Sequence, residues 1–128
     1  MEPLIMAETK STPEVNFDSN NHVLEIKGES YPENAAKFYG PVFAWLEAYL
    51  PTLQPEQNLV VNVTISYFNS SSSKALMNFF GMLEDAQRAG KSILVNWYYD
   101  PDNDTAVECG EEFMEDCRDL NFRLQATG

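Results

Sequence analysis

The chain has 128 residues, which suits one domain, and its 44% hydrophobic and 12% aromatic residues suffice for a packed core. A formal net charge of −12, from 20 acidic and 8 basic residues, argues against nucleic-acid and anionic-membrane binding, because both need clustered Lys and Arg. This negative charge suits a basic protein partner or simple solubility. No apolar run approaches the roughly 20 residues that span a membrane.

The first strands of the chain are predicted after a polar start. Residues 1–12 are polar or weakly apolar, so we predict a flexible N-terminal arm before a single domain of residues 13–128. The arm lacks the basic start and long apolar stretch of a secretory signal, so we expect a cytoplasmic protein. Residues 14–18 and 23–28 alternate like strands on either side of an Asp-Ser-Asn-Asn turn, which predicts a hairpin.

A helix with a proline inside it is predicted next. Ser30-Tyr31-Pro32-Glu33 has the capping-box form, so Ser30 is the expected N-cap. Apolar residues then recur at helical spacing as far as Leu50, and Pro51 supplies a stop, which predicts a helix from about Pro32 to Leu50. Pro41 lies inside this run and is expected to kink the helix or divide it in two.

Four consecutive serines stand where a strand turns into a helix. Residues 59–65 are apolar and largely β-branched, which predicts a buried strand, and residues 75–86 have helical periodicity. Between them, residues 66–74 read Ser-Tyr-Phe-Asn-Ser-Ser-Ser-Ser-Lys. Met77 lies towards the edge of the helix, where it belongs either to the core or to a partner surface.

This junction suits an anion. The first turn of a helix has backbone N–H groups without partners and the positive end of the helix dipole. A phosphate on one of the serines would add roughly −1.5 to −2 charges next to those donors, and Lys74 would supply a counter-charge. The alternative is that Asn69 or Ser70 only caps the helix.

The rest of the chain completes an alternating pattern. Residues 92–99 form a predicted strand, residues 100–104 an acidic turn, residues 105–119 a helix with a heavily acidic outer face, and residues 122–126 a last strand. The order ββαβαβαβ predicts a single-domain α/β fold with a mixed sheet whose later strands are parallel. In such sheets the loops after the strands' carboxyl ends are the usual functional edge, and the serines lie there.

Neither a metal site nor a disulfide is expected. Cys109 and Cys117 lie eight positions apart in a predicted helix, about 12 Å along its axis, whereas a disulfide needs Cα atoms within about 7 Å. Asp100, Asp102 and Asp104 alternate as in a calcium loop, but Thr105 occupies the position that requires glycine. We therefore predict no cofactor.

Catalysis is not expected either. Serine nucleophiles at strand-to-helix turns have the form Gly-x-Ser-x-Gly, and no glycine flanks this serine run. The single histidine, His22, lies in a distant predicted turn and is a poor candidate base. The remaining alternatives are a phosphorylated switch and an acidic interaction module that is never phosphorylated.

Several segments resemble a known family. The topology, with a hydroxyl residue at the start of the helix after the third strand, resembles the STAS fold of bacterial anti-sigma-factor antagonists. The chain more closely resembles the SiaC family of regulatory phosphoproteins from biofilm control, through segments that span most of the chain in order: residues 11–13 (Ser-Thr-Pro), 28–34 (Gly-Glu-Ser-Tyr-Pro-Glu-Asn), 69–72 (Asn-Ser-Ser-Ser), 74–75 (Lys-Ala), 83–86 (Leu-Glu-Asp-Ala), 97–100 (Trp-Tyr-Tyr-Asp), 111–113 (Glu-Glu-Phe) and 115–117 (Glu-Asp-Cys).

The resemblance implies a regulator rather than an enzyme. In the family, a dedicated serine/threonine kinase phosphorylates a hydroxyl residue just after the Asn, a metal-dependent phosphatase removes the phosphate, and the unphosphorylated form activates a diguanylate cyclase, which raises cyclic di-GMP. Carried over, the acceptor is Ser70. From the local sequence, Asn69, Lys74 and Met77 are expected near this site and the partner surface. The family acceptor is threonine and position 73 is usually apolar, so Ser71, Ser72 and Ser73 stay open as alternatives.

Overall fold

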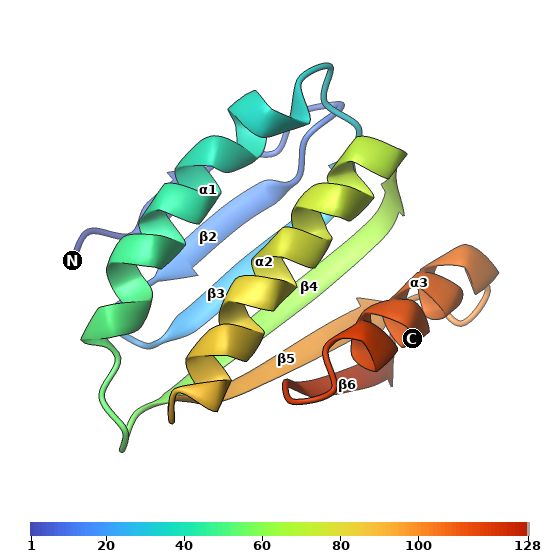
Figure 1. The fold of residues 1–128 in the computed structure, drawn as a ribbon. Helices are drawn as coiled ribbons and strands as arrows, with labels where there is room; N and C mark the ends of the chain where they lie inside the picture. The colour runs from blue at the N-terminus through green and yellow to red at the C-terminus, as the bar shows by residue number, and fades with distance from the viewer. Residues whose placement is uncertain (128) are drawn as a thin grey trace.

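The computed structural model describes residues 1–127, which form one six-stranded sheet with three α-helices (Figure 1). The strands lie side by side in chain order: β1 (Leu4–Met6), β2 (Glu14–Asp18), β3 (Val23–Ser30), β4 (Asn58–Phe68), β5 (Ser92–Tyr99) and β6 (Asn121–Ala126). The helices are α1 (Ala35–Tyr49), α2 (Ser70–Arg88) and α3 (Asp104–Asp116), with a 3-10 turn at Leu50–Thr52.

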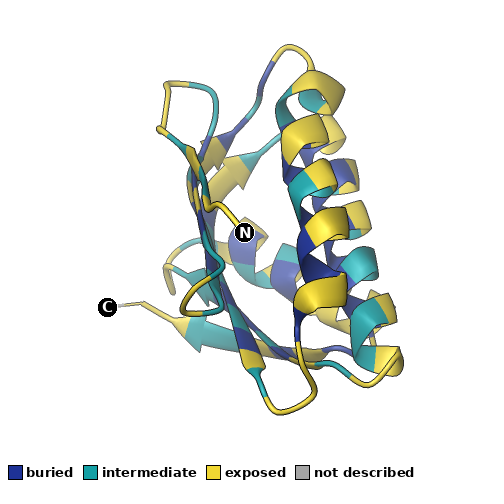
Figure 2. Cartoon of the chain, turned by 90° about the vertical axis from the view of Figure 1, so that its left-hand side faces the viewer, coloured by how far each residue is buried: buried dark blue, intermediate teal, exposed yellow. Residues whose placement is uncertain are grey.

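The sheet is mixed, as predicted. β1, β2 and β3 pair antiparallel, and β3, β4, β5 and β6 pair parallel. The helices lie on one side of the sheet, and the other side is open (Figure 2). The covered side carries the alternate, fully buried residues of the central strands, among them Ile26, Val63 and Trp97. The predicted α/β fold class and strand directions are thus confirmed.

All three α-helices begin at the same edge of the sheet, the one formed by the carboxyl ends of its parallel strands. The parallel strands β3, β4 and β5 end at the same edge, and α1, α2 and α3 begin there. Each helix is capped by an asparagine whose side-chain oxygen accepts a backbone N–H: Asn34 from Lys37 at 3.0 Å, Asn69 from Ser72 at 2.9 Å and Asn103 from Ala106 at 3.1 Å. This carboxyl edge therefore exposes three positive helix ends.

The prediction of a flexible N-terminal arm was wrong for part of residues 1–12. Leu4–Met6 form β1, which pairs with β2 and places Leu4 and Met6 against the core. The indole Nε1 of Trp45 on α1 donates to the carbonyl of Glu2 at 2.8 Å, and this hydrogen bond holds the N-terminal residues against α1. Three alternating residues are too few to predict a strand, and pairing and packing decide the outcome.

Two predictions about the first helix also need correction. Ser30 is not its cap: β3 continues to Ser30, and α1 starts at Ala35 behind Asn34. Because Tyr31 precedes Pro32, its backbone is biased towards extended conformations and away from a helix start. Pro41 does not divide the helix, since α1 runs unbroken from Ala35 to Tyr49. Pro41 and Lys37 are exposed, so water can satisfy the Lys37 carbonyl that lacks an intrahelical donor.

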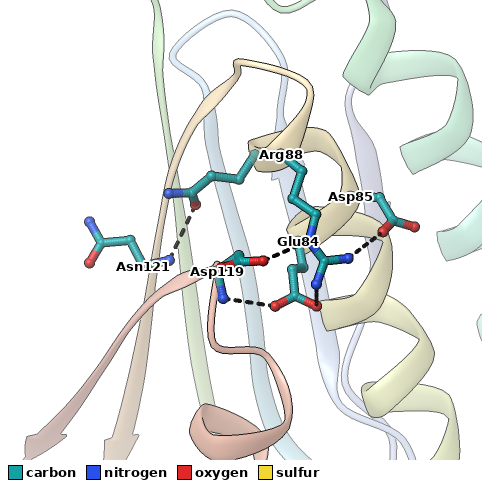
Figure 3. Close-up of polar contacts among 6 residues, drawn as sticks. Glu84, Asp85, Arg88, Asp119 and Asn121 are labelled. Carbon is teal, nitrogen blue, oxygen red and sulfur yellow. Dashed lines mark hydrogen bonds and ion pairs between the residues drawn. The ribbon is translucent and has the colours of Figure 1, made fainter.

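The C-terminal end of α2 is tied to the loop before β6 (Figure 3). Arg88 contacts the carboxylates of Glu84 and Asp85 at 3.4 Å each and donates through Nε to Asp119 at 2.8 Å. The largely buried Glu84 also accepts the backbone N–H of Asp119 at 2.9 Å. The hydrogen bond to Asp119 and the carboxylate of Glu84 raise the pKa of the Arg88 guanidinium. This arginine cluster fixes the α3–β6 loop against α2.

The cysteines are free, as predicted, and Cys117 is buried beside the arginine cluster. Burial, with the Glu84 carboxylate adding to it, raises the pKa of the Cys117 thiol to about 11. The thiol is therefore neutral and unreactive at physiological pH.

Candidate functional site

The four serines differ in exposure because α2 packs one face on the sheet. Ser70 and Ser71 are exposed, Ser73 is half-buried, and Ser72 is 0% exposed. Ser72 lies four residues before Leu76 and seven before Phe79, both fully buried, so helical periodicity turns it inward. That spacing was visible in the sequence, but the prediction treated the four serines as one polar run.

A buried hydroxyl cluster holds Ser72. The Ser30 hydroxyl donates to Ser72 Oγ at 2.8 Å and lies 2.6 Å from the hydroxyl of Tyr39 on α1. Burial raises the pKa of Tyr39, which keeps its hydroxyl neutral. The N–H of Asn69 donates to the Ser30 carbonyl at 3.0 Å. The cluster thus joins β3, α1 and the first turn of α2, and it fixes the turn that carries Ser70.

Sequence reasoning missed this hydroxyl cluster. Ser30 was predicted to be a helix cap, and no polar role was predicted for Tyr39. The available signal was the presence of Ser30 in the Gly-Glu-Ser-Tyr-Pro-Glu-Asn segment, which carries part of the family resemblance.

The first turn of α2 keeps free donors for an anion. Asn69 uses its side chain to accept from Ser72 N–H at 2.9 Å and its carbonyl to accept from Ser73 N–H at 2.9 Å. Within residues 1–127, the backbone N–H groups of Ser70 and Ser71 have no hydrogen-bond partner in the protein. Asn69 is therefore the cap, and both exposed hydroxyls lie at the positive end of the helix dipole.

The exposed serines border two hollows. One, of about 540 Å³, lies between α2 and α3 and is lined by Ser70, Ser71, Ser73, Lys74, Met77, Glu112, Phe113 and Asp116. The other, of about 420 Å³, lies between α1 and α2 and shares Ser71 and Lys74 with the first. Met77 is half-buried, so one side packs on the core while the other faces the α2–α3 hollow.

The charges around the serines come from two helices. Lys74 is the only cation that lines either hollow, and among residues 1–127 every ion pair involves Arg88, so Lys74 has none. Glu112 and Asp116 bring carboxylates from α3 to the hollow that Ser70 borders. These two acidic residues were not predicted as site residues, although the sequence segments that contain them were part of the family resemblance.

The geometry gives the serines no histidine base. His22 lies just before β3, at the opposite edge of the sheet, where its ring pairs with the Tyr49 hydroxyl. An eight-residue strand such as β3 spans roughly 25 Å, which separates that edge from the serines. Among residues 1–127, no three His, Cys, Asp or Glu side chains are arranged to hold a metal ion. Ser70 and Ser71 are exposed, so their hydroxyls are accessible to modification or docking.

Comparison with known proteins identifies the family. Residues 6–127 match the model of the SiaC family of regulatory phosphoproteins. The chain belongs to this family. A protein of Pseudomonas aeruginosa (strain UCBPP-PA14) is 36% identical over 126 residues, which cover 98% of this chain and 98% of that protein.

Solved structures of the family share this fold. Apo-SiaC from Pseudomonas aeruginosa superposes with a TM-score of 0.90 at 36% identity, over 98% of this chain and 100% of that one. A chain from the crystal structure of the diguanylate cyclase SiaD in complex with its activator SiaC, also from Pseudomonas aeruginosa, gives 0.89 at 35% identity, over 97% of this chain and 99% of that one. Across the described residues, none of the helices has the length and apolarity to span a membrane.

Proposed function

We propose that this protein is a non-enzymatic partner switch: its unphosphorylated form binds and activates a diguanylate cyclase, and phosphorylation of Ser70 blocks that binding. The observation that carries the proposal is an exposed hydroxyl at the first position of α2, beside unpartnered backbone donors, in a family of regulatory phosphoproteins. The complex of a SiaC relative with the cyclase SiaD supports the choice of partner.

Ser70 is favoured as the acceptor by position and access. It is exposed and directly follows Asn69, where the family resemblance places the phosphorylated hydroxyl. Ser72 is disfavoured, because its hydroxyl is buried and bonded to Ser30, so a kinase would have to unwind the first turn to reach it. Ser73 is half-buried, and Ser71 is the remaining exposed alternative.

Charge and desolvation explain why phosphorylation would oppose docking. A phosphoryl group brings roughly −1.5 to −2 charges to a chain that already has a net charge of −12, and Glu112 and Asp116 share the hollow that Ser70 borders. Docking against the serines would remove water from that group. A tenfold loss of affinity requires only about 1.4 kcal/mol, which is small beside the cost of desolvating a phosphate.

The switch requires two further partners. A serine/threonine kinase would recognise the exposed turn at Ser70, and a metal-dependent phosphatase would restore the hydroxyl. Lys74, which lies one turn after Ser70 and forms no ion pair within residues 1–127, would pair with the phosphate in the modified state. The cyclase would respond to the form that remains unphosphorylated.

The test compares charge and hydroxyl loss at one position. We expect Ser70→Asp to weaken binding to purified SiaD of Pseudomonas aeruginosa at least about tenfold and to abolish cyclase activation, because it imitates part of the phosphate charge. Ser70→Ala should bind and activate like the unmodified protein. Asn20→Asp, which adds the same charge at an exposed position in the turn between β2 and β3, is the matched control and should bind like the unmodified protein.

Two results would contradict the proposal. Equal SiaD affinity of Ser70→Asp and Ser70→Ala would favour an acidic interaction module that phosphorylation does not regulate. Intact mass after co-expression with a serine/threonine kinase that phosphorylates the protein, followed by peptide mapping, identifies the modified residue. A phosphate on Ser71 alone would move the switch by one position and overturn the assignment to Ser70.

A further inference from the structure

One face of the sheet, the open face, is covered by none of the helices in residues 1–127 (Figure 2). Its four neighbouring strands β3, β4, β5 and β6 run parallel, and parallel strands are usually covered on both faces. On β4 and β5 the side chains that alternate with the buried core point to the open face. Among them Val60, Leu94 and Tyr98 are half-buried, and Asn96 is only 6% exposed. The open face therefore has a partly apolar middle that suits contact with another protein surface.

The middle of the open face is also uncharged. The open-face side chains of its two central strands are all neutral: Asn58, Val60, Asn62, Thr64 and Ser66 on β4, and Ser92, Leu94, Asn96 and Tyr98 on β5. Three amides form a ladder across it, since Asn96 Nδ2 donates to Asn62 Oδ1 at 3.0 Å and Gln125 Nε2 donates to Asn96 Oδ1 at 2.8 Å. Charges on this face are thus confined to the strands on either side.

Those outer strands carry charges of opposite sign. The open face bears Glu25 on β3 and Arg123 on β6, and neither forms an ion pair within residues 1–127. The strand register places them at the two ends of one row across the sheet: Glu25, Asn62, Asn96 and Arg123. At about 4.8 Å between neighbouring strands, three spacings separate their backbones by roughly 14 Å. The two charges of one copy are therefore too far apart to pair with each other.

Glu25 also borders a hollow in the open face. This hollow, of about 450 Å³, lies over the carboxyl half of the parallel strands. Its charged lining consists of four carboxylates and one cation: Glu8, Glu14, Glu25, Asp100 and Lys27. Within residues 1–127 none of the five forms an ion pair. The hollow therefore has a net negative charge and space for the end of a cationic side chain.

We propose that two copies of this chain pack open face to open face, with Arg123 of each copy reaching Glu25 at the acidic hollow of the other. A two-fold axis parallel to the strands, above the line between β4 and β5, places β3 of one copy opposite β6 of the other and β4 opposite β5. Each row keeps its level along the strands in this arrangement. Glu25 then faces Arg123 of the second copy, and Val60 faces its Leu94. One pattern of residues thus complements itself, as a two-fold contact requires.

The dimensions and charges of the two copies fit this packing. Stacked sheets lie about 10 Å apart, and side chains of both inner faces fill the space between them. Each copy has a net charge of −12, but physiological salt screens charges that are more than about 8 Å apart. The two close Glu25–Arg123 pairs then fix the alignment of the faces.

The contact area predicts a weak dimer. Four strands about 4.8 Å apart, each with about six residues in contact, cover roughly 19 by 20 Å. That footprint is smaller than the roughly 800 Å² per partner of stable complexes, so dimerisation depends on protein concentration. The helices lie on the outer sides of such a dimer, and the serine-bearing edges of both copies point to the same end. Self-association therefore leaves Ser70 accessible and is independent of the partner switch.

The test exchanges the two charges. Glu25→Arg and Arg123→Glu each place like charges opposite one another, whereas the two substitutions together restore opposite charges with their positions reversed. Sedimentation equilibrium over a range of protein concentrations measures the dimer dissociation constant, and thermal unfolding checks that each variant folds. We expect each single variant to weaken dimerisation at least about tenfold, and the double variant to return to within about threefold of the unmodified protein.

Two controls change the net charge equally outside the open face. Glu47→Arg on α1 matches Glu25→Arg, and Arg118→Glu in the loop before β6 matches Arg123→Glu; both residues are exposed. Each control should alter the dissociation constant less than about threefold. Equal effects of controls and open-face variants would overturn the proposal, because they would assign the losses to net charge.

Three further results would overturn the proposal. The first is a chain that stays monomeric at every concentration reached. The second is a double variant as weak as the single variants, which would place the dimer contact elsewhere. The third is a loss of SiaD binding in Glu25→Arg without a change in self-association, which would show that the open face binds the cyclase. The Ser70 variants should dimerise like the unmodified protein, so failure of the partner switch and failure of the dimer are distinguishable.

Discussion

The two ends of α2 are built in opposite ways. At the serine end, residues 69–77, the exposed side chains are neutral hydroxyls and one lysine that forms no ion pair with the part of the chain that the structure describes. At the arginine end, residues 84–88, Arg88 and Glu84 bind the α3–β6 loop through ion pairs and a backbone hydrogen bond. The cation of the arginine end is paired with carboxylates of the same chain, whereas Lys74 at the serine end has no ion pair among residues 1–127.

The difference shows how the serine end can change its charge while α2 keeps its structure. The hydroxyl cluster of Ser30, Tyr39 and Ser72 and the Asn69 cap hold the first turn of α2 from below. The arginine cluster holds the far end of the same helix. Under the proposed switch, a phosphate on Ser70 would act on a turn that stays in place, and the partner would meet the new charge at a fixed position.

The largest expected effect separates two serines of the same turn. Ser72→Asp should lower the free energy of unfolding by about 3 kcal/mol or more, because it buries a carboxylate beside hydroxyls that are already paired. Ser70→Asp should stay within about 1 kcal/mol of the unmodified protein, since an exposed acid at a helix start is tolerated or favoured. Urea unfolding measures both, and equal losses would contradict the inward position of Ser72.

The next effect concerns the arginine end. Glu84→Ala should lower the free energy of unfolding by about 2 kcal/mol, because the backbone N–H of Asp119 and Arg88 lose a largely buried acceptor. Asp85→Ala removes the neighbouring carboxylate, which is 78% exposed, and should cost less than about 0.5 kcal/mol. Neither variant should change SiaD affinity, and a weakened complex would show that the two ends are coupled.

A smaller effect appears at alkaline pH. The unfolded Cys117 thiol ionises near its ordinary pKa of 9.0, whereas the folded thiol ionises near 11. Between these values the unfolded state binds fewer protons, so stability is fully present below pH 9 and falls by about 1 to 2 kcal/mol as pH rises to 11. Urea unfolding between pH 8 and 11 should show a shallower loss in Cys117→Ala. An identical slope in that variant would assign the alkaline loss to other groups, such as Tyr49, whose pKa burial raises to about 12.

The smallest effect tests the cap of the serine end. Asn69→Ala should lower the free energy of unfolding by about 1 kcal/mol, because Ser72 N–H loses its side-chain acceptor. Asn34→Ala, which removes the equivalent cap of α1, is the matched control and should cost a similar amount. We expect only Asn69→Ala to increase proteolytic cleavage near Ser70, and equal cleavage in both variants would show that the cap does not order this turn.

Much of the fold was predictable because it depends on local chemistry. The Asp18 turn between β2 and β3 is fixed by its own side chain, which accepts the backbone N–H groups of Asn20 and Asn21 at 2.9 and 3.1 Å, and the hydrogen bonds from Asn21 lower the pKa of Asp18. The β4–α2 junction was likewise predicted, since a β-branched run followed by a helical pattern leaves little choice. β1 was missed, because its three residues depend on β2 and Trp45, which the local pattern does not reveal.

The sequence by itself determined the acidic charge, the alternation of strands and helices, and the placement of four hydroxyls at a helix start, because periodicity and backbone preference are properties of neighbouring residues. Only the tertiary structure decided which hydroxyls face solvent and what faces them. Packing of α2 on the sheet sets the rotation that buries Ser72 against Ser30 and exposes Ser70. The position of α3 across β5 and β6 brings Glu112 and Asp116 to the serines. These residues lie about forty positions away in the chain, so only the pairing of the strands between them makes them neighbours.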